Sequence, residues 1–316
     1  MFFEGAEKKL EVYLKPELEI DLMTLPESFW EGLVHSVNAK ILSKIESEDC
    51  KAFLLSESSL FVYKSTFTMI TCGTTQLVNA VSEFLKSYKA EDIEALFYER
   101  KNEIFGHYQP SHFFDDVREL RKYIEGKAYR FGEESEHHVY LFTTEDKFVP
   151  DEEDCTLEIL MNGLQGTAKD LFLCGQEVTA MEIREKSGLS EVLAGYSVDD
   201  YVFSPCGYSL NALKGNCYAT IHVTPEAVGS YASFETNAAT PEERKYWIDR
   251  IIGIFKPTSF DVLVFDDKVT TIPEIETYSK KSVYSSDLKC GFQVQYSSYY
   301  YPQDKPQKAY EYGSEI

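Results

Sequence analysis

The sequence has few basic residues for its length. Lysine and arginine together number 31 against 53 aspartates and glutamates, so the formal net charge at neutral pH is −22. Such a surplus of negative charge opposes binding to nucleic acids and to anionic membranes, which attract basic surfaces. The composition therefore excludes both as expected partners and favours cationic small molecules, although most of the carboxylates serve simply to keep the chain soluble.

Other signals are missing as well. The seven cysteines are odd in number and form no CxxC pair, so they indicate neither a disulfide framework nor a zinc site. No apolar run is long enough to cross a bilayer, and Met1 leads straight into Phe2-Phe3-Glu4-Gly5 without a signal region. We therefore expect a cytoplasmic protein in a reducing compartment.

The chain is well supplied with core-forming residues. Of its 316 residues, 43% are hydrophobic and 14% aromatic, which indicates a folded globular protein. The length suits one large sandwich or a duplicated domain.

Strand and helix patterns alternate through the first half. Apolar residues at every second position predict strands, and apolar residues three and four apart predict helices. The predicted strands are 10–14, a pair joined by a turn at 64–66, 93–100, and a hairpin of 127–131 with 139–143. The predicted helices are 28–45, 75–88 and 112–123.

The second half repeats this layout. A hairpin region spans 207–235, and a helix is predicted to begin at Thr240-Pro241-Glu242-Glu243, with Thr240 as its cap. Its expected buried stripe is Trp247, Ile248, Ile251, Ile252 and Phe255. Strands followed by a helix, twice, indicate two similar α/β halves.

The stretch Leu54–Tyr63 is the most unusual in the chain. Ser56, Glu57, Ser58 and Ser59 interrupt an apolar, strand-like run that extends from 52 to 70. Serine and glutamate inside a strand compete for backbone hydrogen bonds, so a fold that keeps them usually has a local use for them. The ordinary alternative is a strand with solvent-facing serines.

Four further segments accompany this stretch. They are Phe2-Phe3-Glu4-Gly5-Ala6-Glu7-Lys8, Thr71-Cys72-Gly73-Thr74-Thr75, Phe203-Ser204-Pro205-Cys206-Gly207-Tyr208-Ser209 and Thr220-Ile221-His222-Val223-Thr224-Pro225-Glu226. Together, in this order, the five segments resemble the eukaryotic S-adenosylmethionine decarboxylase proenzyme family, from Phe2 to about Phe255.

The resemblance implies an α+β fold. It is a four-layer α/β/β/α sandwich of two antiparallel sheets flanked by helices and built from two similar halves. We expect a single domain over 1–316, with a loose C-terminal tail over about 302–316.

The resemblance also implies the cofactor. Decarboxylating an amino acid leaves a carbanion that no ordinary side chain can hold, and nothing in the sequence matches a pyridoxal site. The family uses a pyruvoyl group, which in this chain would form from Ser58 by autocatalytic cleavage between Glu57 and Ser58 and would bind the amine of S-adenosylmethionine as a Schiff base. The products would be a small chain, 1–57, and a large chain, 58–316.

Three further residues receive catalytic roles from the resemblance. His222 is the base that removes the α-hydrogen of Ser58, a task that calls for titration near neutrality. Ser209 assists the acyl rearrangement, and Cys72 reprotonates the substrate carbon. Without the motif, the histidine would be interpreted as a hydrogen-bonded core residue and the cysteine as a small hydrophobe.

The same resemblance implies a substrate site. It consists of active-site carboxylates, an aromatic pair that stacks on adenine, a carboxylate for the ribose hydroxyls, and the residue before the cleavage point: Glu4 and Glu7, Phe3 and Phe203, Glu226, and Glu57. A glutamate pair so near the N-terminus would otherwise be interpreted as solvated.

A second group matches the family's buried site for putrescine, a diamine that activates some members. It comprises Glu11, Phe97, Asp154, Thr156, Glu158 and Glu235. Clustered buried carboxylates repel one another, so they need protons or a cation. Lys9 and Ile70 stand where the animal pattern has an apolar residue and a lysine, and we expect the Lys9 ammonium to replace the diamine in part.

Two other functions compete with this interpretation. A catalytically weak regulatory paralogue would bind an active decarboxylase chain, but it would be expected to lose part of the cleavage or proton-donor residues, which are all present. A Ser/Cys/His hydrolase would need a GxSxG elbow or a third triad member, and neither is identifiable. A homodimer of processed protomers is also compatible with the resemblance.

Overall fold

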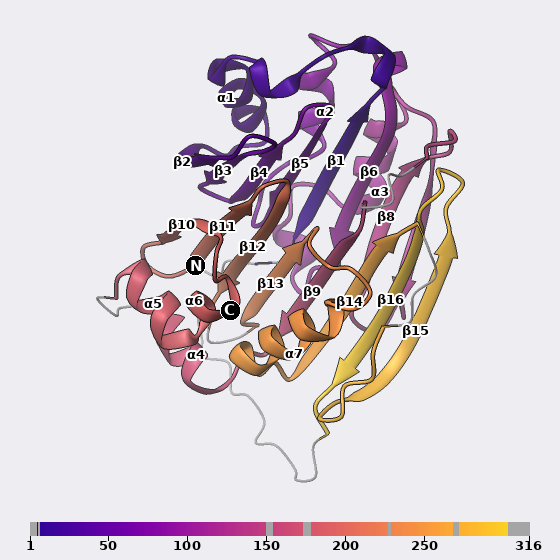
Figure 1. The fold of residues 1–316 in the computed structure, drawn as a ribbon. Helices are drawn as coiled ribbons and strands as arrows, with labels where there is room; N and C mark the ends of the chain where they lie inside the picture. Colours follow the sequence, from indigo (N-terminus) through magenta and orange to yellow (C-terminus); the bar gives the residue numbers. More distant parts are fainter. Residues whose placement is uncertain are drawn as a thin grey trace.

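Two eight-stranded antiparallel sheets make up most of the protein (Figure 1). The computed structural model describes residues 5, 7–149, 154–172, 178–226, 229–267 and 272–302, apart from the side chains of 167–169. The first sheet contains β1 (Lys8–Leu14), β2 (Ile41–Glu46), β3 (Lys51–Leu55), β4 (Ser58–Val62), β5 (Thr66–Thr71), β6 (Ile93–Lys101), β7 (Gly126–Gly132) and β8 (His138–Thr144). The second contains β9 (Thr156–Asn162), β10 (Ser197–Val202), β11 (Tyr208–Lys214), β12 (Cys217–Thr224), β13 (Tyr231–Thr236), β14 (Ser259–Asp266), β15 (Ser279–Asp287) and β16 (Gln293–Tyr300).

Helices connect the strands in both halves. The first half has α1 (Glu27–Ser36), α2 (Asn79–Phe84) and α3 (Phe113–Leu120), and the second has α4 (Gly166–Phe172), α5 (Ala180–Ser187), α6 (Leu189–Val192) and α7 (Arg244–Phe255). Short 3-10 turns occur at Pro16–Leu18, Leu22–Thr24, Ala90–Asp92 and Gly106–Tyr108.

The two sheets share one strand order. The first runs β2-β3-β4-β5-β1-β6-β8-β7, and the second runs β10-β11-β12-β13-β9-β14-β16-β15. In each half the first strand is therefore inserted between the fifth and the sixth strands of that half. This identical order confirms the prediction of two similar halves.

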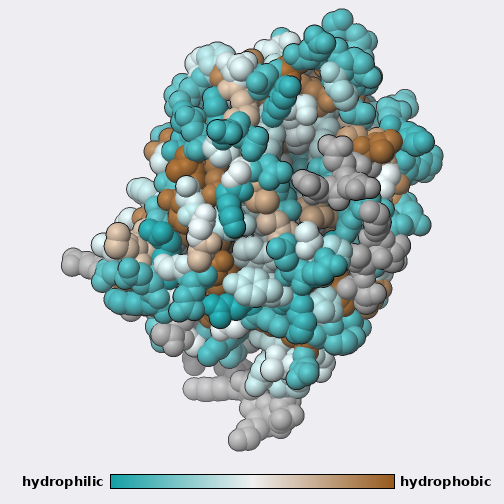
Figure 2. All heavy atoms as spheres, viewed as in Figure 1, coloured by the Kyte–Doolittle hydropathy of each residue, from teal (hydrophilic) through white to brown (hydrophobic). Residues whose placement is uncertain are grey.

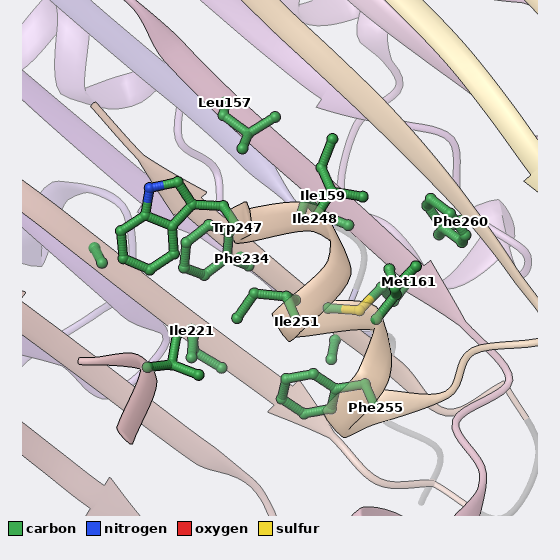
Figure 3. Close-up of a cluster of buried hydrophobic side chains, with 14 of the residues drawn as sticks. Leu157, Ile159, Met161, Ile221, Phe234, Trp247, Ile248, Ile251, Phe255 and Phe260 are labelled. Carbon is green, nitrogen blue, oxygen red and sulfur yellow. The ribbon is translucent and has the colours of Figure 1, made fainter. Parts of the chain in front are cut away.

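The outer face of each sheet is covered by the helices of its own half. In the first half, Trp30 and Leu33 of α1 and Phe84 of α2 share one buried cluster with Leu10 and Val12 of β1. In the second half, α7 lies across the sheet, and Figure 3 shows Trp247, Ile248, Ile251 and Phe255 directed towards side chains of β9, β12 and β13. These contacts form the two outer interfaces of the predicted four-layer sandwich.

The inner faces of the two sheets pack on each other. Phe97 and Leu141 of the first sheet share a buried cluster with Leu160 and Leu263 of the second. At another point, the rings of Phe61 on β4 and Tyr218 on β12 lie 4.3 Å apart between centroids. The α/β/β/α order of layers is thus confirmed.

Side chains of β1 alternate between the outer core and the space between the sheets, as a strand requires. Leu10 and Val12 join the outer core, as predicted for the strand at 10–14. Lys9 bonds to Glu158 of the opposite sheet, and Glu11 lines a cavity shared with that sheet. One strand therefore supplies both packing and inward-facing charge.

The predicted helix at 28–45 is wrong in its second half. Helix α1 ends at Ser36, Asn38 takes a positive φ of 66°, and the chain reverses into β2. Ile41, Ser43 and Ile45 of β2 lie on one side of a half-exposed strand, so their spacing satisfied the strand period as well. The predicted helix at 75–88 likewise shrinks to Asn79–Phe84, because the Thr75 hydroxyl turns back to Thr71 and to the Cys72 carbonyl.

The helix predicted to begin at Thr240 starts later, at Arg244. The Thr240 hydroxyl donates to the Glu243 carboxylate over 3.0 Å, and its backbone carbonyl accepts from the Glu243 N–H. The same carbonyl accepts from the Arg244 N–H over 3.1 Å, so the segment is a turn that leads directly into α7. The predicted buried stripe of α7 is confirmed in full.

The thiols depart from the sequence expectation at one position. Cys206 is disulfide-bonded, whereas Cys50, Cys72, Cys155, Cys217 and Cys290 are thiols outside any disulfide.

Hydrophilic residues predominate on the face shown in Figure 2, with apolar ones in small groups. Within the described ranges, no helix combines the length and apolarity needed to cross a membrane.

Candidate functional site

A tight hairpin turn carries the predicted cleavage point. Leu55 of β3 pairs with Ser58 of β4, so Ser56 and Glu57 alone form the connection. Ser58 has a φ of 145°, a value that side-chain-bearing residues rarely adopt and that costs about 1–3 kcal/mol. Its hydroxyl is buried and has no hydrogen-bond partner in the described part of the chain. Strain and an uncommitted nucleophile thus coincide at one residue.

Cys72 lies against the carbonyl of the predicted cleavage bond. Its backbone N–H donates to the Glu57 oxygen over 3.0 Å, and its thiol donates to the same oxygen over 3.2 Å. Burial raises the pKa of the Cys72 thiol, as do the carboxyl groups of Glu57 and Glu7. The thiol is therefore protonated, as a proton donor must be.

Lys8 holds the other side of this loop. Its ammonium donates to the Gly73 carbonyl over 2.8 Å and to Gln109 over 3.0 Å. Burial lowers the pKa of Lys8 to about 8, and the nearby guanidinium of Arg100 acts in the same direction. No sequence motif indicated a role for Lys8.

His222 belongs to a buried polar network between the sheets. Its Nδ1 lies 3.0 Å from the Ser209 hydroxyl, which is its cross-strand neighbour. Its Nε2 lies 2.9 Å from Thr220 Oγ1 and 3.3 Å from Ser59 Oγ. Ser59 in turn donates to Asn211 Oδ1 over 2.6 Å.

The expectation that His222 titrates near neutrality is wrong. Burial lowers the pKa of His222 to about 3, and no carboxylate lies beside the ring to offset that effect in the described part of the chain. The imidazole is therefore neutral at physiological pH and able to accept a proton, but it is a weak base. The sequence assigned no role to Ser59, Thr220 or Asn211. Ser59 belongs to the unusual stretch at 54–63 and Thr220 opens the segment of His222, but neither position by itself indicates which side chain its hydroxyl will bond.

One cavity collects most of the predicted reaction residues. It measures about 230 Å³. Its lining includes Glu57, Cys72, Phe203, Ser209, His222 and Glu226. Phe203 is half-buried and meets the exposed ring of Tyr201 edge-on at 4.9 Å. Residues from both sheets thus form a small chamber beside the cleavage bond.

Glu7 lies between the sheets near this chamber. It is half-buried and accepts a hydrogen bond of 2.7 Å from Ser233 of β13. Burial raises its pKa to about 8, with a further contribution from Glu235 and Glu158. Glu7 is therefore protonated at neutral pH. Phe3 and Glu4, the other predicted residues of this segment, lie outside the described residues.

A second cavity of about 380 Å³ lies between the sheets. Four of the six residues predicted for the diamine line it: Glu11, Phe97, Asp154 and Thr156. Tyr13 donates to Glu11 over 3.0 Å, and Thr68 donates to the same oxygen over 3.3 Å. Aromatic walls that no sequence motif indicated are added by Tyr13, Tyr63, Tyr218 and Phe292.

The remaining two residues of that group, Glu158 and Glu235, bind Lys9 instead. The Lys9 ammonium lies 2.5 Å from Glu158 and 3.2 Å from Glu235, and all three side chains are buried. Burial alone would lower the pKa of Lys9, but Glu158 and Glu235 raise it well above its usual value. Tyr218 also donates to Glu235. Lys9 is thus a permanent cation among carboxylates.

The position opposite Lys9 is informative. In the antiparallel pair of β1 and β5, Lys9 is the direct partner of Ile70. The two departures from the animal pattern therefore occupy facing positions on neighbouring strands.

In the described part of the chain, no cluster of histidine, cysteine and carboxylate side chains has the arrangement of a metal site.

Comparison with known proteins identifies close relatives. The family model for adenosylmethionine decarboxylase matches residues 1–305. The S-adenosylmethionine decarboxylase proenzyme of Drosophila melanogaster is 35% identical, with 92% of this chain and 91% of that protein covered. The proenzyme of Xenopus laevis is 36% identical, with 84% and 83% covered.

A solved structure shows the same architecture. The crystal structure of the Trypanosoma brucei AdoMetDC-delta26 monomer superposes with a TM-score of 0.61 at 27% sequence identity. The alignment covers 77% of this chain and 99% of that chain.

Proposed function

Because the chain belongs to the adenosylmethionine decarboxylase family, we propose that it decarboxylates S-adenosylmethionine after cutting its own backbone between Glu57 and Ser58. The product would be the aminopropyl donor for spermidine and spermine synthesis. The observation that carries this proposal is the strained turn at Ser58, whose buried hydroxyl is uncommitted beside Cys72.

Cleavage begins with attack by the Ser58 hydroxyl on the Glu57 carbonyl carbon. The peptide C–N bond breaks as the nitrogen takes the hydroxyl proton, which leaves an ester to Ser58 Oγ and a free amine. A base then removes the α-hydrogen of Ser58, and the Cβ–Oγ bond of Ser58 breaks. The backbone carboxylate of Glu57 leaves as the new C-terminus of the small chain, and residue 58 becomes dehydroalanine. Water then displaces ammonia, and residue 58 becomes the pyruvoyl group at the start of the 58–316 chain.

Two features of the turn favour this attack. The backbone N–H and the thiol of Cys72 both donate to the Glu57 oxygen, where negative charge develops during the attack. Cleavage also releases the strain of about 1–3 kcal/mol stored at Ser58. His222, paired with Ser209, is the base for the α-hydrogen, since its neutral ring can accept a proton.

The residues around position 58 also suit the cofactor, because a serine can yield a pyruvoyl group by this route and Ser58 is buried. When present, that group supplies the electron sink that decarboxylation requires. The protonated Cys72 thiol is placed to return a proton to the substrate carbon, and neutral Glu7 is a second proton source nearby. Phe203 offers its ring to the adenine, and Glu226 offers its carboxylate to the ribose.

Intact mass and activity of one purified sample test this proposal. The parent chain should separate into 1–57 and 58–316, and the large chain should resist Edman degradation because it lacks an N-terminal amine. Ser58→Ala should remain one inactive chain. Ser65→Ala, an exposed serine in the next hairpin, is the matched control and should cleave normally.

Three outcomes would contradict the proposal. One is a stable chain of full mass that still decarboxylates the substrate. Another is a large chain with a free amine, which indicates ordinary proteolysis. The third is complete cleavage without activity, which favours the regulatory paralogue.

We further propose that the second cavity binds a diamine such as putrescine and that Lys9 already supplies part of its charge. Glu11 and Asp154 present carboxylates to the cavity, and aromatic rings of Phe97 and Tyr13 can face an ammonium group. The neighbouring pair Glu158 and Glu235 needs no ligand cation, since Lys9 occupies it.

The position of Lys9 supports this division of charge. A lysine at position 70, as in the animal pattern, would project on the same side of the sheet as residue 9, from the neighbouring strand. Either position therefore places an ammonium group near the same carboxylates. The catalytic Glu7 stands on the same segment of chain, two residues before Lys9.

Titration of putrescine against activity in the parent, Asp154→Asn and Lys9→Leu tests this second proposal. Coupling between such sites is typically about 1–3 kcal/mol, or roughly 5- to 150-fold. We expect a weak response in the parent, a weaker one in Asp154→Asn and a strong one in Lys9→Leu. Equally flat responses in all three would make the cavity purely structural.

A further inference from the structure

The two nitrogens of the His222 ring have different surroundings. Nδ1 faces one hydroxyl, that of Ser209, at 3.0 Å. Nε2 faces two, Thr220 Oγ1 at 2.9 Å and Ser59 Oγ at 3.3 Å. Burial keeps the ring neutral by lowering its pKa to about 3, so the ring carries a single N–H. Which nitrogen carries it follows from the hydrogens of the three hydroxyls.

The hydroxyl hydrogens beside Nε2 are already used. Thr220 donates to the Leu210 backbone carbonyl over 3.0 Å and lies 3.1 Å from Asn211 Oδ1. Ser59 donates to Asn211 Oδ1 over 2.6 Å. A hydroxyl has one hydrogen but two lone pairs, so both groups can still accept a hydrogen bond. They cannot both donate to Nε2.

The Asn211 side chain presents its amide oxygen to both hydroxyls. Oδ1 accepts from Ser59 over 2.6 Å and lies 3.1 Å from Thr220 Oγ1, so an acceptor, and not a donor, faces these two groups. The buried Asn211 nitrogen has no hydrogen-bond partner in the described part of the chain. The fold therefore accepts the free-energy cost of one unsatisfied donor and keeps Oδ1 as the acceptor for the hydroxyls.

From this arrangement we infer that His222 is held as the Nε2–H tautomer, with Nδ1 as its basic nitrogen directed at Ser209. Thr220, Ser59 and Asn211 are then positioning residues, whose side chains act on cleavage through the His222 ring. The consequence for cleavage is that the His222 ring can accept a proton only at Nδ1, the nitrogen that faces Ser209. This inference rests on the proposed self-cleavage for its consequence, but the tautomer itself does not depend on it.

Nitrogen NMR of the full-length Ser58→Ala chain tests the tautomer directly. This variant keeps the chain uncleaved, and the chemical shifts of ring nitrogens separate protonated from unprotonated positions. His222→Gln in the same background assigns the signals among the six histidines. We expect Nε2 to carry the hydrogen and Nδ1 to be bare. A hydrogen on Nδ1 would overturn the inference.

Cleavage kinetics test the positioning residues. The double variant Ser59→Ala/Thr220→Val removes both acceptors beside Nε2 and should slow cleavage at least ~10-fold, with the tautomer signals mixed or reversed. The single variant Thr220→Ser keeps a hydroxyl at position 220 and should keep both the parent cleavage rate and the parent tautomer. If the double variant cleaves at the parent rate with an unchanged tautomer, the positioning role is wrong.

The two proposals fail in distinguishable ways. A parent chain that never cleaves but shows the Nε2–H tautomer would overturn the proposed function and leave this assignment standing. A parent chain that cleaves normally but shows the Nδ1–H tautomer would do the reverse.

Discussion

Two polar networks between the sheets, one around His222 and one around Lys9, neutralise their polar groups in opposite ways. Around His222, the network consists of hydroxyls, an amide and a neutral ring, and its hydrogen bonds join uncharged partners, as between Ser59 and Asn211. Around Lys9, one ammonium is shared by Glu158 and Glu235, with the carboxylate of Glu11 nearby. The first network has no formal charge to compensate, and the second depends on a single cation.

This difference assigns different sensitivities to the two regions. Hydroxyls and amides do not titrate, so the His222 network keeps its arrangement across the physiological pH range. The carboxylate region holds Glu235, whose pKa burial raises to about 7 despite the opposing effect of Lys9. Changes in pH, cations or Lys9 should therefore act mainly on the second region.

Lys9→Leu should have the largest effect on stability. Removing one partner of a buried ion pair typically costs about 3–5 kcal/mol, because the remaining carboxylates are left without compensation. We also expect Ile70→Lys to restore part of the loss in the double variant, since residue 70 faces residue 9 on the next strand. Chemical denaturation measures both effects.

The control for this change is Lys44→Leu, which removes an exposed lysine paired with Glu27 and Glu46 and should cost about 1 kcal/mol or less. The loss of unfolding free energy caused by Lys9→Leu should also grow as pH rises. Lys9 lowers the pKa of Glu235, so without Lys9 the folded chain holds this proton to a higher pH than the parent does, and its stability falls more steeply with pH. A deficit that is constant from acid to alkaline pH would contradict this account.

Cys72→Ala tests the neutral region. Decarboxylation should fall at least ~100-fold because the thiol proton is lost, whereas cleavage should persist at a reduced rate because the backbone N–H still donates to Glu57. Steady-state assays and intact mass measure the two effects. Cys290→Ala, a buried thiol in the inner core, is the matched control. Unchanged turnover in Cys72→Ala would assign this residue to packing alone.

Glu7→Gln should have the smallest effect, confined to pH dependence. Burial raises the pKa of Glu7 from its ordinary value of 4.5 to about 8. The folded chain therefore binds more protons than the unfolded chain between these values, and the contribution of Glu7 to stability is lost as pH rises through this window. Glu7→Gln should flatten the fall in unfolding free energy between about pH 4.5 and 8.

Thermal or chemical unfolding at several pH values makes this measurement. Glu17→Gln, an exposed carboxylate on the following turn, should leave the profile unchanged. An identical slope in Glu7→Gln and the parent would show that Glu7 is ionised in the folded chain.

Local pattern was sufficient for much of the fold. Strands at 10–14 and 93–100, the hairpin of 127–131 with 139–143 and the stripe of α7 follow directly from apolar periodicity. The pattern was insufficient at 28–45, where Ile41 and Ile45 satisfied both the helical and the strand period. In the structure Asn38 takes a positive φ after α1, and the residues from Ile41 pair with β3 as a strand.

The sequence by itself determined which residues have unusual chemistry: a serine and a glutamate inside an apolar run, a cysteine, a histidine and a surplus of carboxylates. Only the tertiary structure decided their states. Lys9 and Glu158 are 149 residues apart, and His222 is 163 residues from Ser59, so no local pattern reports their contacts. The shifts of Glu7 towards its neutral form and of His222 far below neutrality arise from burial between two sheets, a property that exists only once both halves have packed together.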